Sequence, residues 1–308
     1  MELVRGLHNL RPRYRGCAAT IGNFDGVHLG HQAVLGQLSE RAALLQLPVT
    51  VMTFEPQPQE YFRPDTAPPR LTRFREKVEA LRRFGVERLV CLRFDRHLAS
   101  LTPEEFIRII LVEGLGVRYL VVGDDFRFGK GRAGTFGQLK QAGAAHGFPV
   151  VNMHTFDING ARVSSTRIRT ALEAGDLAGA ESLLGRPYRM SGRVAHGDKR
   201  GRTIGFPTAN IHLHRTATPV AGVFAVELFG PPGEPLPGIA NVGTRPTVDG
   251  TRSLLEVHLF DFDADIYGCH VQVEFLHKIR DEHHFESFAA LQQQIARDVE
   301  QARGWFGR

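Results

Sequence analysis

Two histidines stand three positions apart where a predicted strand gives way to a predicted helix. The segment Gly22–His31 reads Gly-Asn-Phe-Asp-Gly-Val-His-Leu-Gly-His. Its glycines let backbone N–H groups come close to a ligand, and a helix start favours negative charge. His28 and His31 fall roughly on one helical face, where both rings can hydrogen-bond a phosphate as its charge grows in a transition state. The pattern indicates a phosphate site. The alternatives are a glycine-rich turn with surface histidines and a metal pair, for which no third ligand is near in the sequence.

A second group of phosphate donors lies at residues 164–169, which read Ser-Ser-Thr-Arg-Ile-Arg. Hydroxyl groups and an arginine at the start of a predicted helix can bind phosphate oxygens. The alternative is an ordinary helix cap, a role that serine and threonine commonly take.

A third candidate lies between Gly192 and Asn210. Glycines are interspersed there with Lys199, Arg200 and Arg202, and residues 205–210 read Gly-Phe-Pro-Thr-Ala-Asn. Backbone amides and cations together can cradle a polyphosphate, although the spacing is not that of a Walker A loop. A basic hairpin loop is the alternative.

A glutamate further along the chain is a candidate general base. In the predicted strand 254–260, Leu255, Val257 and Leu259 share one face, and Glu256 and His258 share the other. A carboxylate flanked by apolar neighbours can have its proton affinity raised, which suits it to take a proton from a substrate. The alternative is a solvated glutamate on the outer face of a sheet.

The elements around these residues predict two domains of different class. In the first half, predicted strands alternate with amphipathic helices, which indicates a parallel sheet covered on both faces. The strands are 18–21, 49–54, 88–92, 119–123 and 149–153, and the helices are 34–45, 74–84, one from 103, and 136–146. Ligands of such folds bind at the carboxyl ends of the strands, so the loops after Ile21 and Val122 are the places to look.

Past Ser164 the pattern changes. Two short helices, 166–174 and 177–184, lead to Gly-Arg-Pro at 185–187, which predicts a boundary between domains 1–185 and 186–308. Strand-like runs without helices between them then indicate an antiparallel barrel or sandwich. These runs are 188–195, 223–229, 238–242, 254–260 and 271–275. A last helix closes the chain, with an apolar stripe at Phe288, Leu291, Ile295 and Val299.

Composition excludes several classes of protein. The 308 residues are 42% hydrophobic, and 38 Lys and Arg against 33 Asp and Glu give a net charge of +5. No block of like charges marks a nucleic-acid-binding arm, and no run of 18 apolar residues predicts a membrane span. The widely spaced Cys17, Cys91 and Cys269 do not suit a disulfide framework or a cysteine zinc site. The moderate positive charge by itself suits phosphate-bearing small molecules as well as RNA. We expect a cytoplasmic protein whose partners include neither nucleic acid nor membrane.

The histidine motif resembles the signature of the nucleotidyltransferase superfamily. Residues 54–58 (Phe-Glu-Pro-Gln-Pro), 69–72 (Pro-Arg-Leu-Thr) and 123–129 (Gly-Asp-Asp-Phe-Arg-Phe-Gly) resemble segments of the FMN adenylyltransferase module of bacterial FAD synthetases. The resemblance implies that His28 and His31 bind the ATP phosphates and the α-phosphate transition state. It assigns the walls of this nucleotide site to Gly22, Asn23, Asp25, Gly30, Ser164, Ser165, Thr166 and Arg169, and flavin contacts to Asp125 and Phe126.

The segment 205–210 is similar to the signature of riboflavin kinases, as are Leu255–Asp263 and Ile279–Glu282. The resemblance implies that Thr208 and Asn210 lie at Mg²⁺ and the nucleotide phosphates, and that Glu256 activates the ribityl 5′-hydroxyl of riboflavin. It assigns further nucleotide contacts to Gly197, Gly201, Arg202 and Pro207, and flavin contacts to Arg280, Glu282 and Phe285. It assigns no role to Lys199 or Arg200.

Together these motifs identify the chain as a member of the bifunctional riboflavin kinase/FMN adenylyltransferases, the prokaryotic FAD synthetases. The resemblance implies a Rossmann-like nucleotidyltransferase domain with a parallel sheet, followed by a riboflavin kinase-like antiparallel β-barrel with a closing helix. It implies ATP, riboflavin and FMN as substrates, FAD as product and Mg²⁺ as cofactor. An RNA-linked adenylate-forming enzyme and a flavin-binding protein without turnover are the alternatives, and the oligomeric state stays open.

Overall fold

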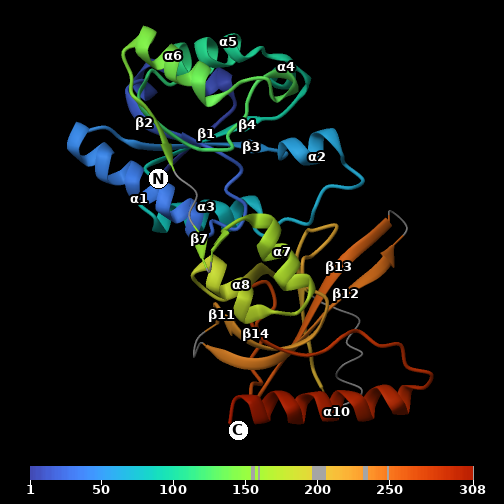
Figure 1. The fold of residues 1–308 in the computed structure, drawn as a ribbon. Helices are drawn as coiled ribbons and strands as arrows, with labels where there is room; N and C mark the ends of the chain where they lie inside the picture. The colour runs from blue at the N-terminus through green and yellow to red at the C-terminus, as the bar shows by residue number, and fades with distance from the viewer. Residues whose placement is uncertain (154–156, 159, 196–205, 232–234, 248–249, 308) are drawn as a thin grey trace. The chain divides into compact units, whose positions relative to one another are not determined.

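The chain folds into two compact units, which Figure 1 traces from the amino to the carboxyl terminus. The computed structural model describes residues 1–153, 157–158, 160–195, 206–231, 235–247 and 250–307. The first unit comprises residues 1–68 and 72–164, and the second comprises 69–71 and 165–308. The helices α7 (Ser165–Glu173) and α8 (Leu177–Leu184) therefore cluster with the second unit. The domain boundary at residue 185 stays a prediction.

The first unit is built on a parallel sheet, as the sequence predicts, and this sheet has six strands where five were predicted. In spatial order its strands are β1 (Glu2–Arg5), β4 (Arg88–Arg93), β3 (Val49–Glu55), β2 (Cys17–Ile21), β5 (Val117–Gly123) and β6 (Val150–Met153). From β2 the chain moves to one side through β3 and β4 and later returns to the other side through β5. The order thus reverses between β2 and β5, and such a switch point is where open α/β sheets bind ligands.

Helices cover both faces of this sheet (Figure 1). A buried apolar cluster fills each interface. On one face, α1 (Leu29–Leu45) and α3 (Phe74–Arg83) contribute Leu35, Leu38 and Leu81. On the other, the π-helical η3 (Ile107–Gly114) and α6 (Phe136–His146) contribute Ile110 and Leu139. The strands are buried on both sides and therefore read as continuous apolar runs.

Shorter elements complete the first unit. They are the 3-10 turns η1 (Leu7–Asn9), η2 (Pro12–Tyr14) and η4 (Lys130–Arg132), the helices α2 (Pro58–Phe62), α4 (Arg96–Ser100) and α5 (Pro103–Phe106), and the hairpin of β7 (Asp157–Ile158) and β8 (Ala161–Arg162). The strand β1 was not predicted, because it is an edge strand of four residues of which Val4 alone is buried.

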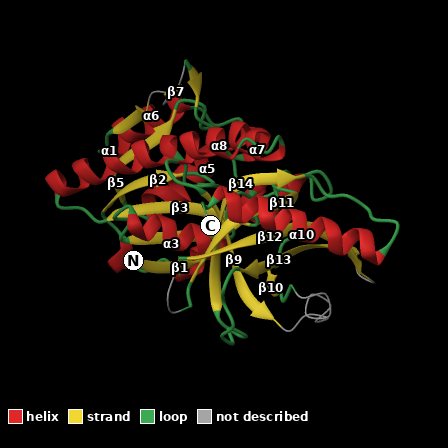
Figure 2. Ribbon diagram, turned by 90° about the horizontal axis from the view of Figure 1, so that it is seen from below, coloured by secondary structure: helices red, strands yellow, loops and turns green. Residues whose placement is uncertain are grey.

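The second unit is a closed antiparallel barrel, also as expected. Around the barrel the order is β10 (Ala209–His212), β13 (Gly250–Leu259), β12 (Leu236–Thr247), β11 (Gly222–Phe229), β14 (His270–Arg280) and β9 (Tyr188–Ala195) (Figure 2). Alternate residues, such as the fully buried Phe224, Val226 and Leu228 of β11, fill its interior. The short β10 was not predicted as a strand.

Helix α10 (Phe288–Trp305) covers part of the outer wall of the barrel. Its Ala302 is buried in a cluster with Val223, Ala225 and Ile239. The predicted apolar stripe is wrong at its first position, because Phe288 is 61% exposed and belongs to no described core cluster. The buried residues of the helix are Asp298 and Ala302, and the polar Asp298 is buried because it pairs with Arg280 of β14. None of the helices among the described residues is long and apolar enough to cross a membrane.

Candidate active sites

The turn between β2 and α1 has an unusual backbone. Phe24 and Val27 adopt φ angles of 49° and 43°, and Gly26 adopts 84°. Left-handed dihedral angles at residues with a side chain cost about 1–3 kcal/mol each. The side chains of Phe24 and Val27 offset this cost because both are buried in the core beneath α1. A turn forced into such a shape at the switch point of the sheet is typical of a functional site.

Asp25 holds this turn from inside. Its Oδ1 accepts hydrogen bonds from the N–H of Thr72 at 3.0 Å and from the Thr72 hydroxyl at 3.3 Å. The Thr72 oxygen in turn accepts from the N–H of Gly26 at 3.0 Å. Asp25 is 2% exposed. The structure therefore shows the carboxylate bound to protein groups, whereas the resemblance assigned it to the wall of the nucleotide site.

The two histidines lie together at the start of α1, as their spacing predicts, and their rings stack. Their ring centroids are 3.7 Å apart and the ring planes are 18° from parallel. His28 caps the helix, its Nδ1 accepting from the N–H of His31 at 3.3 Å. In the neutral ring this leaves the proton on Nε2, a donor suited to a phosphate oxygen. A Cβ at Gly30 would lie 3.3 Å from the His28 ring, a tight contact that would require the ring to shift by a few tenths of an ångström.

His31 stands in a positively charged setting. Burial lowers its pKa well below the ordinary value of 6.5, and the nearby His28, Lys77 and Arg162 lower it further. Its Nδ1 is buried and has no hydrogen-bond partner among the described residues. Lys77 of α3 is itself fully buried. A neutral His31 ring beside cationic side chains is an arrangement that favours a polyanionic ligand.

Asp125 lies in the loop after β5, where the sequence predicts a flavin contact. Its carboxylate binds Arg162 of β8 at 2.8 Å, and Asp124 lies 3.7 Å from the same guanidinium. The hydrogen bond that Arg162 donates to Asp125 is the largest cause of the raised pKa of Arg162. Phe126 stacks on Phe128 with centroids 5.7 Å apart. Sequence reasoning missed Arg162 and Lys77.

The four predicted phosphate donors at residues 164–169 do not all belong to one unit. Ser164 ends the first unit, and Ser165, Thr166 and Arg169 lie in the first two turns of α7 in the second. Arg169 donates from Nε to the carbonyl of Pro69 at 2.7 Å. The role of these four residues at the phosphates stays a prediction.

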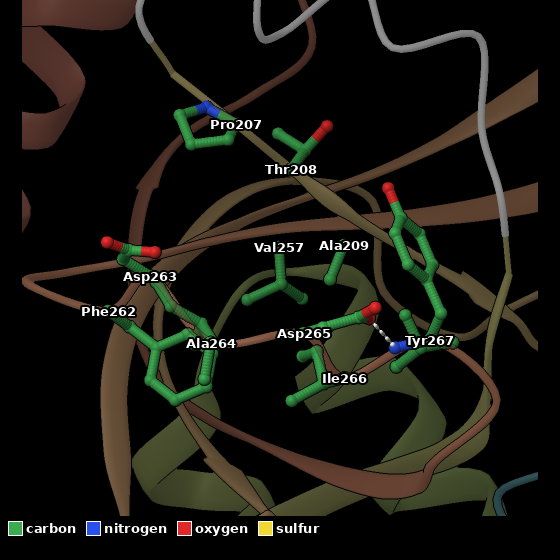
Figure 3. A pocket seen from close by; sticks show the side chains of 12 residues that line it. Pro207, Thr208, Ala209, Val257, Phe262, Asp263, Ala264, Asp265, Ile266 and Tyr267 are labelled. Carbon is green, nitrogen blue, oxygen red and sulfur yellow. Dashed lines mark hydrogen bonds between the residues drawn. The ribbon is translucent and has the colours of Figure 1, made fainter.

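One end of the barrel contains a cavity of about 590 Å³, shown in Figure 3. Its walls are mainly apolar and include Ala209 and Val257, which face each other across β10 and β13. Pro207 and Thr208, from the predicted nucleotide segment, also line it. Asp265 accepts a hydrogen bond from the N–H of Tyr267 at 2.8 Å in the loop on the other side. Apolar walls with a few polar groups are characteristic of small-molecule sites.

Glu256 lies on the outer face of the barrel. Its neighbours Leu255 and Val257 are fully buried and point inward, so Glu256 points the other way. Asn210 of β10 and Asn241 of β12 are its direct partners in register. Residues paired in this way share a face, with Cβ atoms about 4.5–5.5 Å apart. One carboxylate thus stands between two amides.

Two neighbours of Glu256 were missed as site residues at the level of the sequence. Asn241 is one, and the sequence placed it in a predicted strand without indicating a role at a site. His258 is the other, and its Nδ1 donates to the carbonyl of Pro207 at 2.8 Å. This bond ties the nucleotide segment to the strand that carries Glu256.

The predicted flavin contacts lie between β14 and α10. Arg280 makes a two-pronged ion pair with Asp298, at 2.7 Å from Nη2, and lies 5.6 Å from the centre of the Phe285 ring. Glu282 lies over Gly243, where a Cβ would collide with its carboxylate. Gly243 is two residues from Asn241 on β12, so Glu282 meets the barrel face that carries Glu256.

Gly197, Gly201 and Arg202, together with Lys199 and Arg200, lie outside the described residues. Within the described part of the chain, no group of three or more His, Cys, Asp or Glu residues could hold a metal ion.

Comparison with known proteins gives consistent matches. Residues 10–167 match the family model of FAD synthetases and residues 184–306 that of riboflavin kinases. The bifunctional riboflavin kinase/FMN adenylyltransferase of Escherichia coli K12 is 55% identical over 308 residues, which cover 100% of this chain and 98% of that protein. The protein of the same description from Haemophilus influenzae is 52% identical and covers 99% of each.

A solved structure resembles the whole chain. It is described as a macrolide-efflux protein from Streptococcus pneumoniae, and it has a TM-score of 0.83 and 34% identity. The match covers 99% of this chain and 100% of that one.

We expect His31 to stay neutral through the physiological pH range, because burial and neighbouring cations lower its pKa. In ¹³C-histidine NMR, its resonances, assigned from a His31→Gln variant, will not titrate as the pH falls from 8 to about 6.5. Below about pH 6.5, His31 binds a proton in the unfolded chain but stays neutral in the folded protein. The free energy of unfolding therefore falls as the pH drops. Titration of His31 at or above its ordinary pKa would show that burial and the neighbouring cations do not control this ring.

We expect the Asp298→Ala variant to loosen α10, because it leaves the half-buried Arg280 without its carboxylate. The free energy of unfolding should fall by about 3 kcal/mol. Trp305 is the single tryptophan and lies on α10, so its fluorescence in urea reports this transition. The control is Glu79→Ala, which breaks an exposed pair with Arg75 and should change stability by less than about 1 kcal/mol. Equal effects of the two variants would refute a structural role for Asp298.

Proposed function

The chain belongs to the family of bifunctional riboflavin kinase/FMN adenylyltransferases, and we propose which of its residues carry each of the two reactions. The enzyme phosphorylates riboflavin with ATP to give FMN, and then transfers AMP from a second ATP to FMN to give FAD and pyrophosphate. The riboflavin kinase match lies in the carboxyl-terminal part and the FAD synthetase match in the amino-terminal part.

For adenylyl transfer, the observation that carries the assignment is the stacked histidine pair at the switch point of the sheet, in which burial lowers the pKa of His31. An FMN phosphate oxygen attacks the α-phosphorus of ATP, the bond to the bridging oxygen breaks, and pyrophosphate leaves with the charge. His28 donates from Nε2 to a phosphate oxygen, and His31 binds a second. No covalent enzyme intermediate is needed, so positioning and charge neutralisation supply the catalysis.

Other residues of the first site bind and orient the substrates. Gly22, Asn23 and Gly30 leave room for the phosphates, and Asp25 fixes the turn. Ser164, Ser165, Thr166 and Arg169 supply further phosphate donors, and Lys77 and Arg162 add positive charge. Asp125 and Phe126 border the flavin. The support for these roles is the match of residues 10–167, which ends two residues before Arg169, together with the contacts described above.

For the kinase reaction, Glu256 takes the proton of the ribityl 5′-hydroxyl. The hydroxyl oxygen then attacks the γ-phosphorus, and ADP leaves. Asn210 and Asn241, which flank Glu256 in register, hold the hydroxyl and the carboxylate in line. Arg280, Glu282 and Phe285 border the flavin, Arg280 through its pairing with Asp298. The cavity lined by Pro207, Ala209 and Val257 takes the nucleoside of ATP.

The oxygen donors of Thr208 and Asn210 fit a magnesium ion that accompanies ATP. Mg²⁺ keeps several waters and borrows phosphate oxygens, so two neutral protein ligands suffice. When bound, it neutralises charge on the transferring phosphate. Gly197, Gly201 and Arg202 are proposed phosphate contacts on the strength of the resemblance alone. All three cysteines are free, which supports a reducing, cytoplasmic location.

The His28→Ala variant tests the first site. We expect FAD formation from supplied FMN to fall at least 100-fold, roughly the effect of removing a transition-state donor. FMN formation from riboflavin should continue at the normal rate. Flavin chromatography measures both products in one reaction. His146→Ala, at the exposed end of α6, is the matched control and should leave both rates unchanged. A fully active His28→Ala enzyme would remove His28 from the mechanism.

The Glu256→Gln variant tests the second site. The amide keeps the shape of the side chain but cannot take the proton, so FMN formation should fall about 10²- to 10⁴-fold. FAD formation from supplied FMN should persist. Glu300→Gln, on an exposed position of α10, serves as the control for the substitution. Normal FMN production by Glu256→Gln would exclude Glu256 as the base.

A further inference from the structure

Thr72 occupies a place that the two reactions leave unexplained. Its side chain is 7% exposed and lies against the centre of the histidine turn. Its hydroxyl donates to Asp25 and accepts from the N–H of Gly26, and its own N–H binds the same Asp25 oxygen. One residue thus makes three hydrogen bonds to two consecutive positions of the turn.

The turn depends on such support, because its backbone is not in its preferred conformation. Gly26 and Val27 both have positive φ angles, and Val27, being β-branched, resists this conformation strongly. His28 follows Val27 directly. A shift of the peptide at Gly26 would therefore move the His28 ring, whose stacking on His31 fixes the pair.

Thr72 is itself held on a rigid element. The next residue, Arg73, caps α3, and its N–H donates to Glu76 in the first turn of that helix at 2.6 Å. Further along α3, the side chains of Lys77 and Leu81 are fully buried. The hydroxyl of Thr72 is thus fixed relative to the sheet, which is what a residue needs in order to position another.

We propose that Thr72 is a positioning residue for adenylyl transfer: its hydroxyl locks Asp25 and Gly26, and through them it sets the place of His28. The proposal rests on the role proposed above for His28 at the ATP phosphates. Thr72 touches no reacting atom. Removal of its hydroxyl breaks two of the three hydrogen bonds, and the turn relaxes toward a less strained backbone.

The test compares Thr72→Val with Thr72→Ser. Valine keeps the size of the side chain and removes the hydroxyl, whereas serine keeps the hydroxyl. A small displacement of catalytic groups typically costs about 10²-fold in rate. We expect Thr72→Val to lower kcat for FAD formation about 10- to 100-fold with KM for FMN unchanged, and Thr72→Ser to stay within about threefold of the wild type. Loss of a transition-state interaction lowers kcat in this way, whereas weaker ground-state binding would raise KM.

The kinase reaction of the same chain is the internal control for folding and concentration. Thr50→Val, at a fully buried threonine of β3, is the matched control substitution and should leave FAD formation unchanged. Full activity of Thr72→Val would overturn the proposal, and so would an equal loss in Thr72→Val and Thr72→Ser. If Thr72→Val loses both activities through unfolding, Thr72→Ser decides: normal FAD formation supports the role of the hydroxyl, and a selective defect refutes it.

A double-mutant cycle with Asp25→Asn completes the test. Residues that act as one unit are not additive, so the double variant should be no slower than the slower single variant. Additive losses would show independent roles and refute the lock. His28→Ala, measured alongside, separates the two hypotheses. A fully active His28→Ala enzyme refutes the proposed role of the histidine, whereas an inactive one beside a normal Thr72→Val enzyme refutes the role of Thr72 alone.

Discussion

The backbone between β2 and α1 must bring two histidine rings and a helix start to one point, and it does so only with left-handed dihedral angles at Phe24, Gly26 and Val27. Such a conformation persists where its surroundings fix it. Here the turn is fixed by the buried ring of Phe24, by the buried carboxylate of Asp25, and by Thr72, which hydrogen-bonds to Asp25. The parallel sheet supplies the place, because the carboxyl ends of β2 and β5 meet where the strand order reverses.

In the barrel, the alternation of side chains along a strand is enough to build two different surfaces. Successive side chains of a strand point to opposite faces. On β13, Val257 therefore points into the barrel and Glu256 points outward. The apolar cavity at the end of the barrel and the polar row of Asn210, Glu256 and Asn241 therefore lie on two sides of the same wall. A nucleoside and a hydroxyl acceptor can thus approach β10 and β13 from different directions.

Local patterns in the sequence predicted the parallel sheet of the first unit and the antiparallel strands of the second. They also predicted the position of the histidine pair and the alternation around Glu256. These features depend on residues close together in the chain. Lys77, Thr72 and Arg162 were missed as members of the histidine site because tertiary folding brings them there, and locally they look like ordinary helix, loop and hairpin residues. Asp298 was missed because a charged residue in a helix is normally exposed, and here its partner Arg280 makes burial possible.

This one chain forms both bonds, first the phosphate ester of FMN and then the pyrophosphate link of FAD. The most direct measurement is chromatography of the flavins at successive times after purified protein is mixed with riboflavin, ATP and magnesium. We expect FMN to appear first and FAD to follow as FMN declines. FMN that accumulates without FAD would contradict the assignment of the histidine site to adenylyl transfer, and no conversion of riboflavin would contradict the assignment of the Glu256 site to the kinase reaction.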